Sequence, residues 1–195
     1  MKAFDHIQTK DRIARAIRDE ILNGNIEPGE ELAQEALAEM LGVSRMPVRE
    51  ALQTLVQEGF AVRLPNRHIQ AVVLDDRQIR QVFRMAAVME TELAAMAMEN
   101  GKMEENSAVT AASEADFHRQ IAAMAENPYL EQLYLKIMNG YVTYAIENLG
   151  GKEQTLRYLS DASDAFERKD AAAVGNSLEQ YYSLYAEMMT ERSGR

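Results

Sequence analysis

The chain has 195 residues, of which 47% are apolar, and its formal net charge is −10. This length suits one large domain or two small ones with a sizeable core. The absence of cysteine excludes disulfides and thiolate metal sites. No signal-peptide pattern and no apolar run of membrane-spanning length is visible, so we expect a soluble cytoplasmic protein with no membrane partner.

The negative charge is unevenly distributed along the chain. Residues 1–74 contain 9 Lys/Arg and 11 Asp/Glu, a formal −2, so the remaining −8 of the net −10 falls beyond residue 74. The first part is therefore nearly neutral. This does not exclude a nucleic acid partner, because a local basic patch matters more than the charge of the whole chain.

The first predicted helix covers residues 8–23. Its apolar face is formed by Ile13, Ala16, Ile17 and Ile21. Gly24 is the expected end of the helix. Basic residues cover the rest of its surface, and we interpret most of them as a solvated face.

Residues 37–59 predict two helices joined by a tight turn. Leu37 and Leu41 give the first helix an apolar edge, and Gly42 permits the turn because glycine adopts a positive φ without steric cost. Ser44 is the expected N-cap of the second helix, and Pro47 falls in its first turn, where the missing N–H breaks no helical bond. The buried face follows from apolar residues at helical spacing: Val48, Ala51, Leu52, Leu55 and Val56.

The opposite face of this second helix begins with Arg45, Met46 and Arg49. Two arginines near a helix N-terminus oppose the macrodipole, which favours anions there, and a nearby phosphate backbone would remove that objection. A recognition helix enters the major groove with its N-terminal side chains, and arginine can bond guanine or phosphate. The alternative is a solvated face on an ordinary helical hairpin, since this geometry also occurs without DNA.

Residues 60–73 have the pattern of two strands. Phe60–Leu64 and Ile69–Val73 are rich in residues that favour strands, and the segment Pro65–His68 is the expected turn between them. We expect a hairpin with Arg67 and His68 in its turn, where Arg67 could meet phosphate or enter a minor groove.

Residues 41–59 read LGVSRMPVREALQTLVQEG, which closely resembles the signature of GntR-family transcription factors. Flanking residues extend the resemblance from about residue 8 to residue 73. The resemblance implies a winged helix-turn-helix domain in which the following residues contact DNA: Ser44, Arg45, Met46, Arg49, Arg67 and His68. Two positions depart from the family: His68 stands where glycine is usual, and Glu35 stands where many relatives have a residue that can face phosphate.

Beyond residue 74 the pattern predicts only helices. Their expected ranges are about 75–100, 105–125, 129–148, 153–168 and 170–191. The first of them carries an apolar stripe of Ile79, Val82, Phe83, Ala86, Met89, Leu93 and Met96. The predicted fold is therefore mostly α, with a winged helix-turn-helix domain over residues 1–74 and an all-α helical bundle over residues 75–195.

Within this helical part, Glu114-Ala-Asp-Phe-His118-Arg-Gln-Ile and Asn127-Pro-Tyr-Leu130 resemble the FCD domain of one GntR subfamily. The stretch before Glu114 is short for that domain. Many FCD domains bind a divalent metal through one Asp and three His, and the matching positions here are Glu114, His118, Leu159 and Tyr181. Only three histidines exist, and two precede residue 75, so a three-His site within one subunit is impossible. We expect no metal cofactor, although Glu114 and His118 could anchor a weak site together with water or a carboxylate effector.

In place of a metal we expect a cavity for a small polar or anionic metabolite. Its predicted walls are Glu114, His118, Asn139, Thr143 and Tyr181. The alternative for Glu114 and His118, which are four residues apart on one helix face, is an ordinary ion pair or hydrogen bond.

These patterns predict a transcriptional regulator that binds a palindromic operator as a homodimer and responds to a metabolite. Repression is the usual mode in the family that it resembles. One alternative is a DNA-binding protein whose helical part only dimerises and senses no ligand. Another is an enzyme using Glu114 and His118 as an acid/base pair. The sequence shows no nucleophile motif, phosphate loop or cofactor fingerprint, so we predict that it is not an enzyme.

Overall fold

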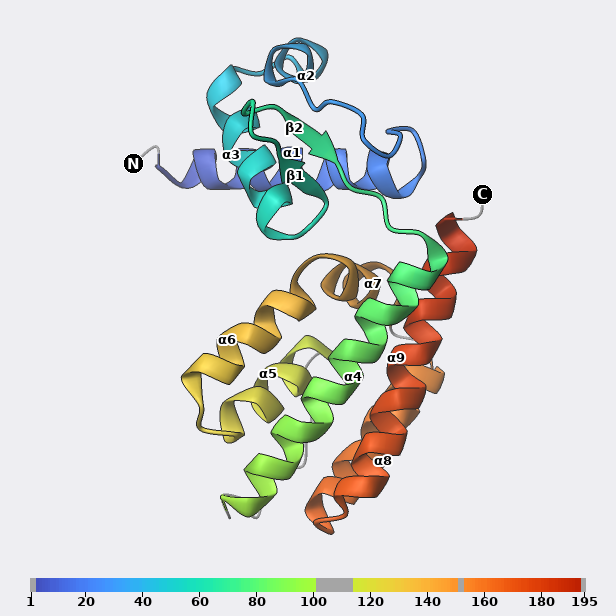
Figure 1. Cartoon of the computed structure of the whole chain (residues 1–195). Helices are drawn as coiled ribbons and strands as arrows, with labels where there is room; N and C mark the ends of the chain where they lie inside the picture. Colours follow the sequence, from blue (N-terminus) through green and yellow to red (C-terminus); the bar gives the residue numbers. More distant parts are fainter. Residues whose placement is uncertain (1–2, 101–113, 151–152, 194–195) are drawn as a thin grey trace. The chain divides into compact units, whose positions relative to one another are not determined.

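The computed structural model describes residues 3–100, 114–150 and 153–193 (Figure 1). The chain forms two compact units that meet in sequence between Asp75 and Asp76. Each unit is described here by itself. None of the helices in the described ranges is long and apolar enough to cross a membrane.

The first unit is a winged helix-turn-helix, which confirms the predicted fold class of this part. Its helices are α1 (Ala3–Leu22), α2 (Gln34–Leu41) and α3 (Arg45–Gln57), and its strands are β1 (Ala61–Arg63) and β2 (Ile69–Ala71). α1 packs against α3, and their shared core includes Ile17, Ile21, Leu52 and Leu55, each at most 2% exposed. The helix-turn-helix therefore rests on an apolar layer that keeps the opposite face of α3 in solvent.

The turn between α2 and α3 follows the sequence prediction in its backbone. Gly42 ends α2 in the left-handed region with φ 64°, and its N–H caps the helix on the Ala38 and Glu39 carbonyls. Ser44 occupies the N-cap position of α3 in an extended conformation, but its side chain makes no capping hydrogen bond. The serine hydroxyl is thus exposed on the same surface as the N-terminus of α3.

The strands β1 and β2 pair antiparallel, with Ala61 opposite Ala71 and Arg63 opposite Ile69. Ala61, Ile69 and Ala71 are buried, while Val62 and Arg63 are exposed. The hairpin therefore attaches to the unit through one face and presents its turn to solvent.

In the described residues the second unit contains helices and no strand. These are α4 (Asp76–Glu99), α5 (Glu114–Met124), α6 (Pro128–Ile137), α7 (Thr143–Leu149), α8 (Glu153–Glu167) and α9 (Ala171–Ser193). α4 and α9 are the two long helices of this unit (Figure 1). The interior is rich in aromatic side chains, and the largest of them with less than 2% exposure include Phe83, Phe117, Tyr134, Tyr181, Tyr182 and Tyr185. A helical bundle is the predicted fold class for this part, and it is confirmed.

The continuous helix expected over residues 129–148 is wrong. The chain is helical to Ile137 and again from Thr143, but Asn139 (φ −61°, ψ 141°) and Gly140 (φ 94°, ψ −120°) between them are not helical. Gly140 adopts a conformation that is essentially restricted to glycine. Periodicity did not reveal this break because apolar residues continue at helical spacing on both sides of it.

The buried face of α4 also differs from the predicted stripe. Ile79, Phe83, Ala86 and Leu93 are buried as expected, but Met96 is 36% exposed. The helix instead buries Glu90, which has no exposed surface. Of the helix predicted over residues 105–125, the part before residue 114 lies outside the described residues.

Candidate functional sites

The residues predicted to contact DNA all lie on the surface of the first unit. The α3 N-terminus exposes Ser44, Arg45 and Arg49, and Met46 is 57% exposed. Arg67 and His68 are exposed at the turn of the hairpin. Arg45, Arg67 and His68 line one surface hollow of about 280 Å³. The structure therefore brings the wing beside the start of α3, as a winged DNA-binding surface requires.

Two carboxylates stand among these cations. Glu35, at the start of α2, forms an ion pair with the guanidinium of Arg45, and both side chains are exposed. Glu31 lies 2.7 Å from Nδ1 of His68 through Oε1. The negative charges of Glu31 and Glu35 lower the local positive potential that the arginines supply. DNA phosphates would therefore have to compete with these carboxylates for Arg45 and His68.

The hairpin turn accommodates His68 without a backbone conformation that requires glycine. The residue with a left-handed backbone is Arg67, with φ 71°. The turn is closed by a hydrogen bond from Arg67 N–H to the Leu64 carbonyl and by one from His68 N–H to Asn66 Oδ1. His68 itself therefore needs no glycine-only conformation, and the strain is carried by Arg67.

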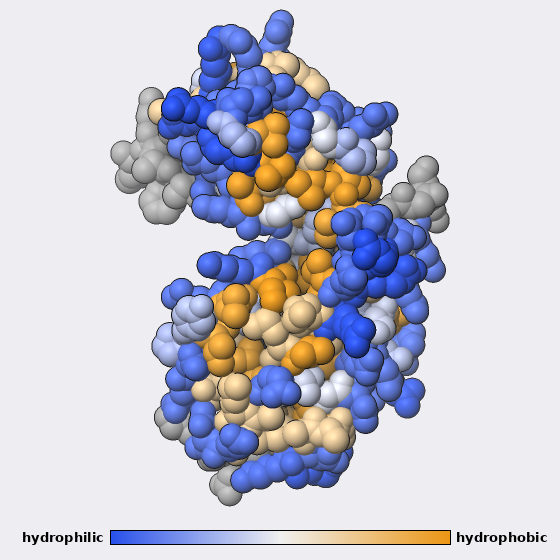
Figure 2. Space-filling view, viewed as in Figure 1, coloured by the Kyte–Doolittle hydropathy of each residue, from blue (hydrophilic) through white to orange (hydrophobic). Residues whose placement is uncertain are grey.

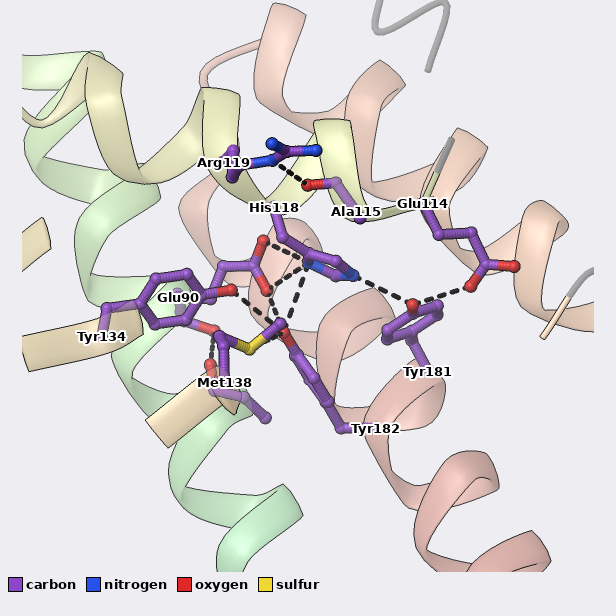
Figure 3. A network of polar contacts seen from close by, with 11 residues as sticks. Glu90, Glu114, Ala115, His118, Arg119, Tyr134, Met138, Tyr181 and Tyr182 are labelled. Atoms are coloured by element: carbon purple, nitrogen blue, oxygen red, sulfur yellow. Dashed lines mark hydrogen bonds and ion pairs between the residues drawn. The ribbon is translucent and has the colours of Figure 1, made fainter. Parts of the chain in front are cut away.

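The second unit contains a buried polar cluster formed by Glu90, Glu114, His118, Thr155, Tyr181, Tyr182 and Tyr185. Figure 3 shows its central members Glu90, His118, Tyr181 and Tyr182 together with Glu114. Both carboxylate oxygens of Glu90 lie 2.8–2.9 Å from Nδ1 of His118. On the other side of the ring, Nε2 lies 2.9 Å from the Tyr181 hydroxyl, which donates to Glu114 Oε2 at 2.8 Å. The cluster is thus a continuous chain from α4 through α5 to α9 and back to the start of α5.

Further hydroxyl groups complete the coordination of the two carboxylates. Tyr182 donates to Glu90 at 2.6 Å, while Tyr185 donates to Glu114 at 2.6 Å. Thr155 of α8 donates to the other oxygen of Glu114 at 3.2 Å. In the described part of the chain no buried side-chain nitrogen or oxygen lacks a hydrogen-bond partner. The cluster therefore satisfies the requirement that buried polar groups be paired.

The tyrosines act as hydrogen-bond donors throughout the physiological pH range. Burial raises the pKa of Tyr181 and Tyr182 far above the ordinary tyrosine value, and the neighbouring carboxylates raise it further. Burial and the hydrogen bond to Glu114 raise the pKa of Tyr185 as well. Each hydroxyl keeps its proton and can stabilise a buried carboxylate by a charge-assisted bond.

The hydrogen bonds of Glu90 and His118 require one more proton than an ionised carboxylate and a neutral imidazole carry together. Since the Tyr181 proton points to Glu114, Nε2 of His118 must donate to the Tyr181 oxygen. The short contact between Nδ1 and Glu90 then needs a second proton, carried either by the imidazole or by the carboxyl group. In both arrangements the ring is fixed by partners on both sides.

This set of side chains does not fit the metal site of the FCD domain. Nδ1 of His118 is taken by Glu90 and Nε2 by Tyr181, so neither ring nitrogen is open to an ion. Leu159 is a buried hydrocarbon, and Tyr181 keeps its proton. Among the residues that the structure describes, no three His, Asp or Glu side chains are grouped to hold a metal. Hydrogen bonds occupy the positions that metal–ligand bonds would need.

A pocket of about 270 Å³ lies beside the cluster. Its lining includes His118, Arg119, Asn139, Thr143 and Glu147. Three of the five predicted effector residues, His118, Asn139 and Thr143, therefore share one pocket. Glu114 and Tyr181 do not line it, because they bond to each other on the far side of the His118 ring. The pocket is thus displaced from the cavity predicted around all five residues.

The helix break after α6 helps to shape this pocket. Asn139, on its wall, is in the non-helical backbone, and Thr143 donates from its hydroxyl across the break to the Met138 carbonyl at 2.8 Å. Arg119 contributes a cation, held by Asp116 at 2.7 Å, and Glu147 contributes a carboxylate. The lining offers both charges and several neutral hydrogen-bonding groups.

Sequence analysis missed several residues of the cluster and the pocket. Glu90 lies seven residues after Phe83 and four after Ala86, so its spacing alone placed a carboxylate on a buried helix face. Arg119 directly follows His118 in the segment that resembles the FCD domain. Tyr182 and Tyr185 had no signal that separated them from other core aromatics.

Two family models match this chain, and together they cover most of both units. A family model described as "Bacterial regulatory proteins, gntR family" matches residues 9–69, and one described as "FCD domain" matches residues 48–183. The gluconate operon transcriptional repressor of Bacillus licheniformis is 34% identical over 90 residues, which cover 46% of this chain and 37% of that protein. This chain thus matches only about a third of the length of the gluconate repressors of two Bacillus species.

Other relatives match along most of the chain. The HTH-type transcriptional repressor RspR of Escherichia coli K12 is 26% identical over 92% of this chain and 88% of its own length. Among solved structures, E. coli McbR/YncC has a TM-score of 0.55 at 21% identity, covering 94% of this chain and 97% of that one. The structure titled "Lar controls the expression of the Listeria monocytogenes agr system and mediates virulence" has a TM-score of 0.59 at 18% identity, over 93% of this chain and 96% of that one. These structural likenesses show a shared fold.

Proposed function

The chain belongs to the GntR family of bacterial regulatory proteins with an FCD domain, and we propose that it binds a palindromic operator as a homodimer under the control of a metabolite. Its family and relatives are DNA-binding transcriptional regulators and not enzymes. We assign residues 1–74 to operator binding and residues 75–195 to dimerisation and effector binding. The observation that carries the DNA assignment is the exposed cationic N-terminus of α3 beside the wing.

In this proposal Arg45 and Arg49 read base edges in the major groove, with Ser44 and Met46 beside them. Arg67 and His68 of the wing contact phosphate or the minor groove. A bidentate arginine–guanine contact is worth about 1–3 kcal/mol, so Arg49→Ala should weaken specific binding about 5- to 150-fold. Arg67→Ala should weaken binding to all sequences more evenly. Relatives named as repressors support repression as the mode of control.

Fluorescence anisotropy with a footprinted operator tests this assignment. The matched control is Arg168→Ala, which removes the same charge from an exposed site in the helical unit. Arg49→Ala should lose specific affinity while Arg168→Ala keeps it. Equal operator affinity of wild type and Arg49→Ala would show that α3 is not the recognition helix.

A homodimer follows from the size of one winged unit, which reads only a half-site and buries modest area on DNA. Two-fold symmetry of the protein would then match a palindromic operator. Light scattering should report a dimer at micromolar concentration, and footprinting should protect two inverted half-sites. A monomer on a single half-site would contradict this part of the proposal.

The pocket beside His118 is our proposed effector site. Arg119, together with the amide of Asn139 and the hydroxyl of Thr143, favours a small polar or anionic metabolite. Glu114 and Tyr181 would act behind His118 by fixing its ring, not by touching the ligand. Ligand binding to the folded protein should raise its melting temperature and change its operator affinity.

A thermal-shift panel of small carboxylates and polar metabolites tests the effector site. Asn139→Ala and Thr143→Val alter the wall while leaving the buried cluster in place, and each should weaken the thermal shift of a bound metabolite. Gln154→Ala, on α8 outside the pocket, is the control. A ligand whose shift survives both wall variants would bind elsewhere.

The second candidate is a helical unit that dimerises without sensing a ligand. One observation favours it: the cluster around Glu114 and His118 is completely hydrogen-bonded without any ligand. If no metabolite in the panel changes the melting temperature or operator affinity, this candidate replaces the first.

A further inference from the structure

The outward face of α4 carries apolar side chains that its own unit does not cover. Met85 and Val88 are each 51% exposed and Met96 is 36% exposed, on the side opposite the buried Ile79, Phe83 and Glu90. Figure 2 shows apolar surface over the part of the helical unit where α4 and α6 lie in Figure 1. Leu133 of α6, which packs against α4, adds a further side chain at 41% exposure.

Along this face runs a stripe whose charges are arranged symmetrically about Val88. The stripe consists of Arg77, Gln81, Arg84, Val88, Glu92, Ala95 and Glu99. Successive members are separated by four, three, four, four, three and four residues, which keeps all of them on one side of a helix with 3.6 residues per turn. All except the half-buried Ala95 are exposed. Cations occupy one half of the stripe, and anions occupy the other half at equal distances from Val88.

We propose that this stripe is the contact through which two copies of the chain pair, with α4 antiparallel to its counterpart and the two-fold axis at Val88. This inference rests on the proposed homodimer and names the surface that forms it. About that axis, Arg84 faces Glu92 of the second copy, and Arg77 faces Glu99. Gln81 faces the small Ala95, and the two Val88 side chains meet each other. A parallel pairing would instead place like charges opposite each other.

The electrostatics of α4 support an antiparallel partner. Asp76 is favourably placed in the first turn, but Arg77 in that turn and Glu99 in the last turn are opposite to what the helix macrodipole favours. An antiparallel copy places its Glu99 beside Arg77 and its Arg77 beside Glu99. The arrangement that is unfavourable within one helix thus becomes favourable between two.

The dimensions are also compatible with a dimer contact. The 24 residues of α4 span about 36 Å at ~1.5 Å per residue. Stable interfaces bury roughly 800 Å² per partner. A single helix face supplies less area than that, so neighbouring side chains must contribute. Met85, Met96 and Leu133 flank the stripe and extend the apolar area across α4 and onto α6. A crossing angle of about 20° keeps Arg84 and Glu92 within reach, because each lies only four residues from the axis.

Charge reversal tests the proposal in the full chain. Arg84→Glu places two anions opposite each other at two symmetric positions, and it should raise the dimer dissociation constant at least tenfold in analytical ultracentrifugation. Glu92→Arg should do the same with cations. The double variant Arg84→Glu with Glu92→Arg restores opposite charges across the axis and should recover dimer formation. Thermal melting of each variant at high concentration checks that the bundle remains folded.

A cysteine at the axis gives a second measurement, because the natural chain has none. In Val88→Cys the two sulfurs should form an intermolecular disulfide under mild oxidation, since helix axes ~8–10 Å apart bring their Cα atoms within the disulfide range of about 4.4–6.8 Å. Leu156→Cys on α8, equally exposed at 51%, is the control and should remain uncrosslinked.

The outcomes separate this inference from the homodimer itself. A wild-type chain that is monomeric at micromolar concentration, with and without operator, would overturn both. A wild-type dimer that is unaffected by either single reversal, with Val88→Cys crosslinking no faster than Leu156→Cys, would overturn the α4 contact and leave the homodimer standing. Loss of dimer in both single variants and recovery in the double variant establishes the contact.

Discussion

Replacing Tyr181 with phenylalanine removes one oxygen from the centre of the buried polar cluster. That oxygen donates to Glu114 at 2.8 Å and accepts from Nε2 of His118 at 2.9 Å. The ring itself has no exposed surface and would keep its packing against Tyr182 and Tyr185. The substitution therefore tests the hydrogen bonds almost separately from the apolar core.

The two hydrogen bonds of Tyr181 should not contribute equally to the loss of stability in Tyr181→Phe. Glu114 keeps its hydrogen bonds from Tyr185 and Thr155, so its carboxylate remains paired. Nε2 of His118 loses its partner in a site that is only 2% exposed. Leaving one buried polar group unsatisfied costs about 1–3 kcal/mol, and a hydrogen bond to a charged group contributes about 1.5–3 kcal/mol. We therefore expect destabilisation of ~2–3 kcal/mol.

Thermal unfolding followed by circular dichroism measures this effect. For a unit of this size, about 3–5 °C is lost per kcal/mol, so Tyr181→Phe should lower the Tm of the helical unit by about 6–15 °C. Tyr129→Phe is the matched control, because Tyr129 is 76% exposed and its Tm should equal that of wild type. If Tyr181→Phe and Tyr129→Phe both have the Tm of the wild-type chain, the cluster does not stabilise the fold through these hydrogen bonds.

Three further results are expected. Glu35→Gln should strengthen operator binding about 2- to 5-fold at low salt and less at high salt, because it frees Arg45 and removes an anion from the DNA-contacting surface; weaker binding by anisotropy would mean that Glu35 positions Arg45 for contact. Gly140→Ala should destabilise the helical unit by about 1–3 kcal/mol in urea unfolding, since φ 94° is strained for alanine, and an unchanged midpoint would disprove the strain. Above about pH 10 stability should fall, because burial raises the pKa of Tyr181 and Tyr182 and only the unfolded chain ionises there. Phenolate absorbance should then appear together with the loss of helical circular dichroism, and gradual ionisation of the native state would contradict this.

Several features of this chain follow from local sequence. Gly42 ends α2 with a positive φ, and the apolar spacing from Val48 to Leu55 places one face of α3 in the core. Both depend on backbone preference and helical period, which neighbouring residues determine. The resemblance around Arg45 and Arg49 added the winged fold and the expected DNA partner. These predictions needed no knowledge of distant contacts.

The buried cluster depended on contacts between distant residues. His118 and Tyr181 are 63 positions apart, and their hydrogen bond exists because α5 and α9 pack side by side. The resemblance to the FCD domain placed both residues at one candidate site, but it could not separate a ligand wall from an internal hydrogen bond. The helix break at Asn139–Gly140 forms part of the wall of the open pocket, in the place that Glu114 and Tyr181 were predicted to take.

Glu90 shows the physical reason most clearly. A carboxylate in an apolar stripe is costly unless a partner reaches it, and periodicity cannot show whether one does. The partners of Glu90 are His118 from α5 and Tyr182 from α9, both within 2.9 Å of its oxygens. Helical period and apolar spacing predicted α4, α5 and α9 and most of the apolar faces that bring them together. The burial of Glu90, the occupation of both His118 nitrogens and the place of the open pocket beside the cluster follow from how α4, α5, α6 and α9 pack, which local sequence does not specify.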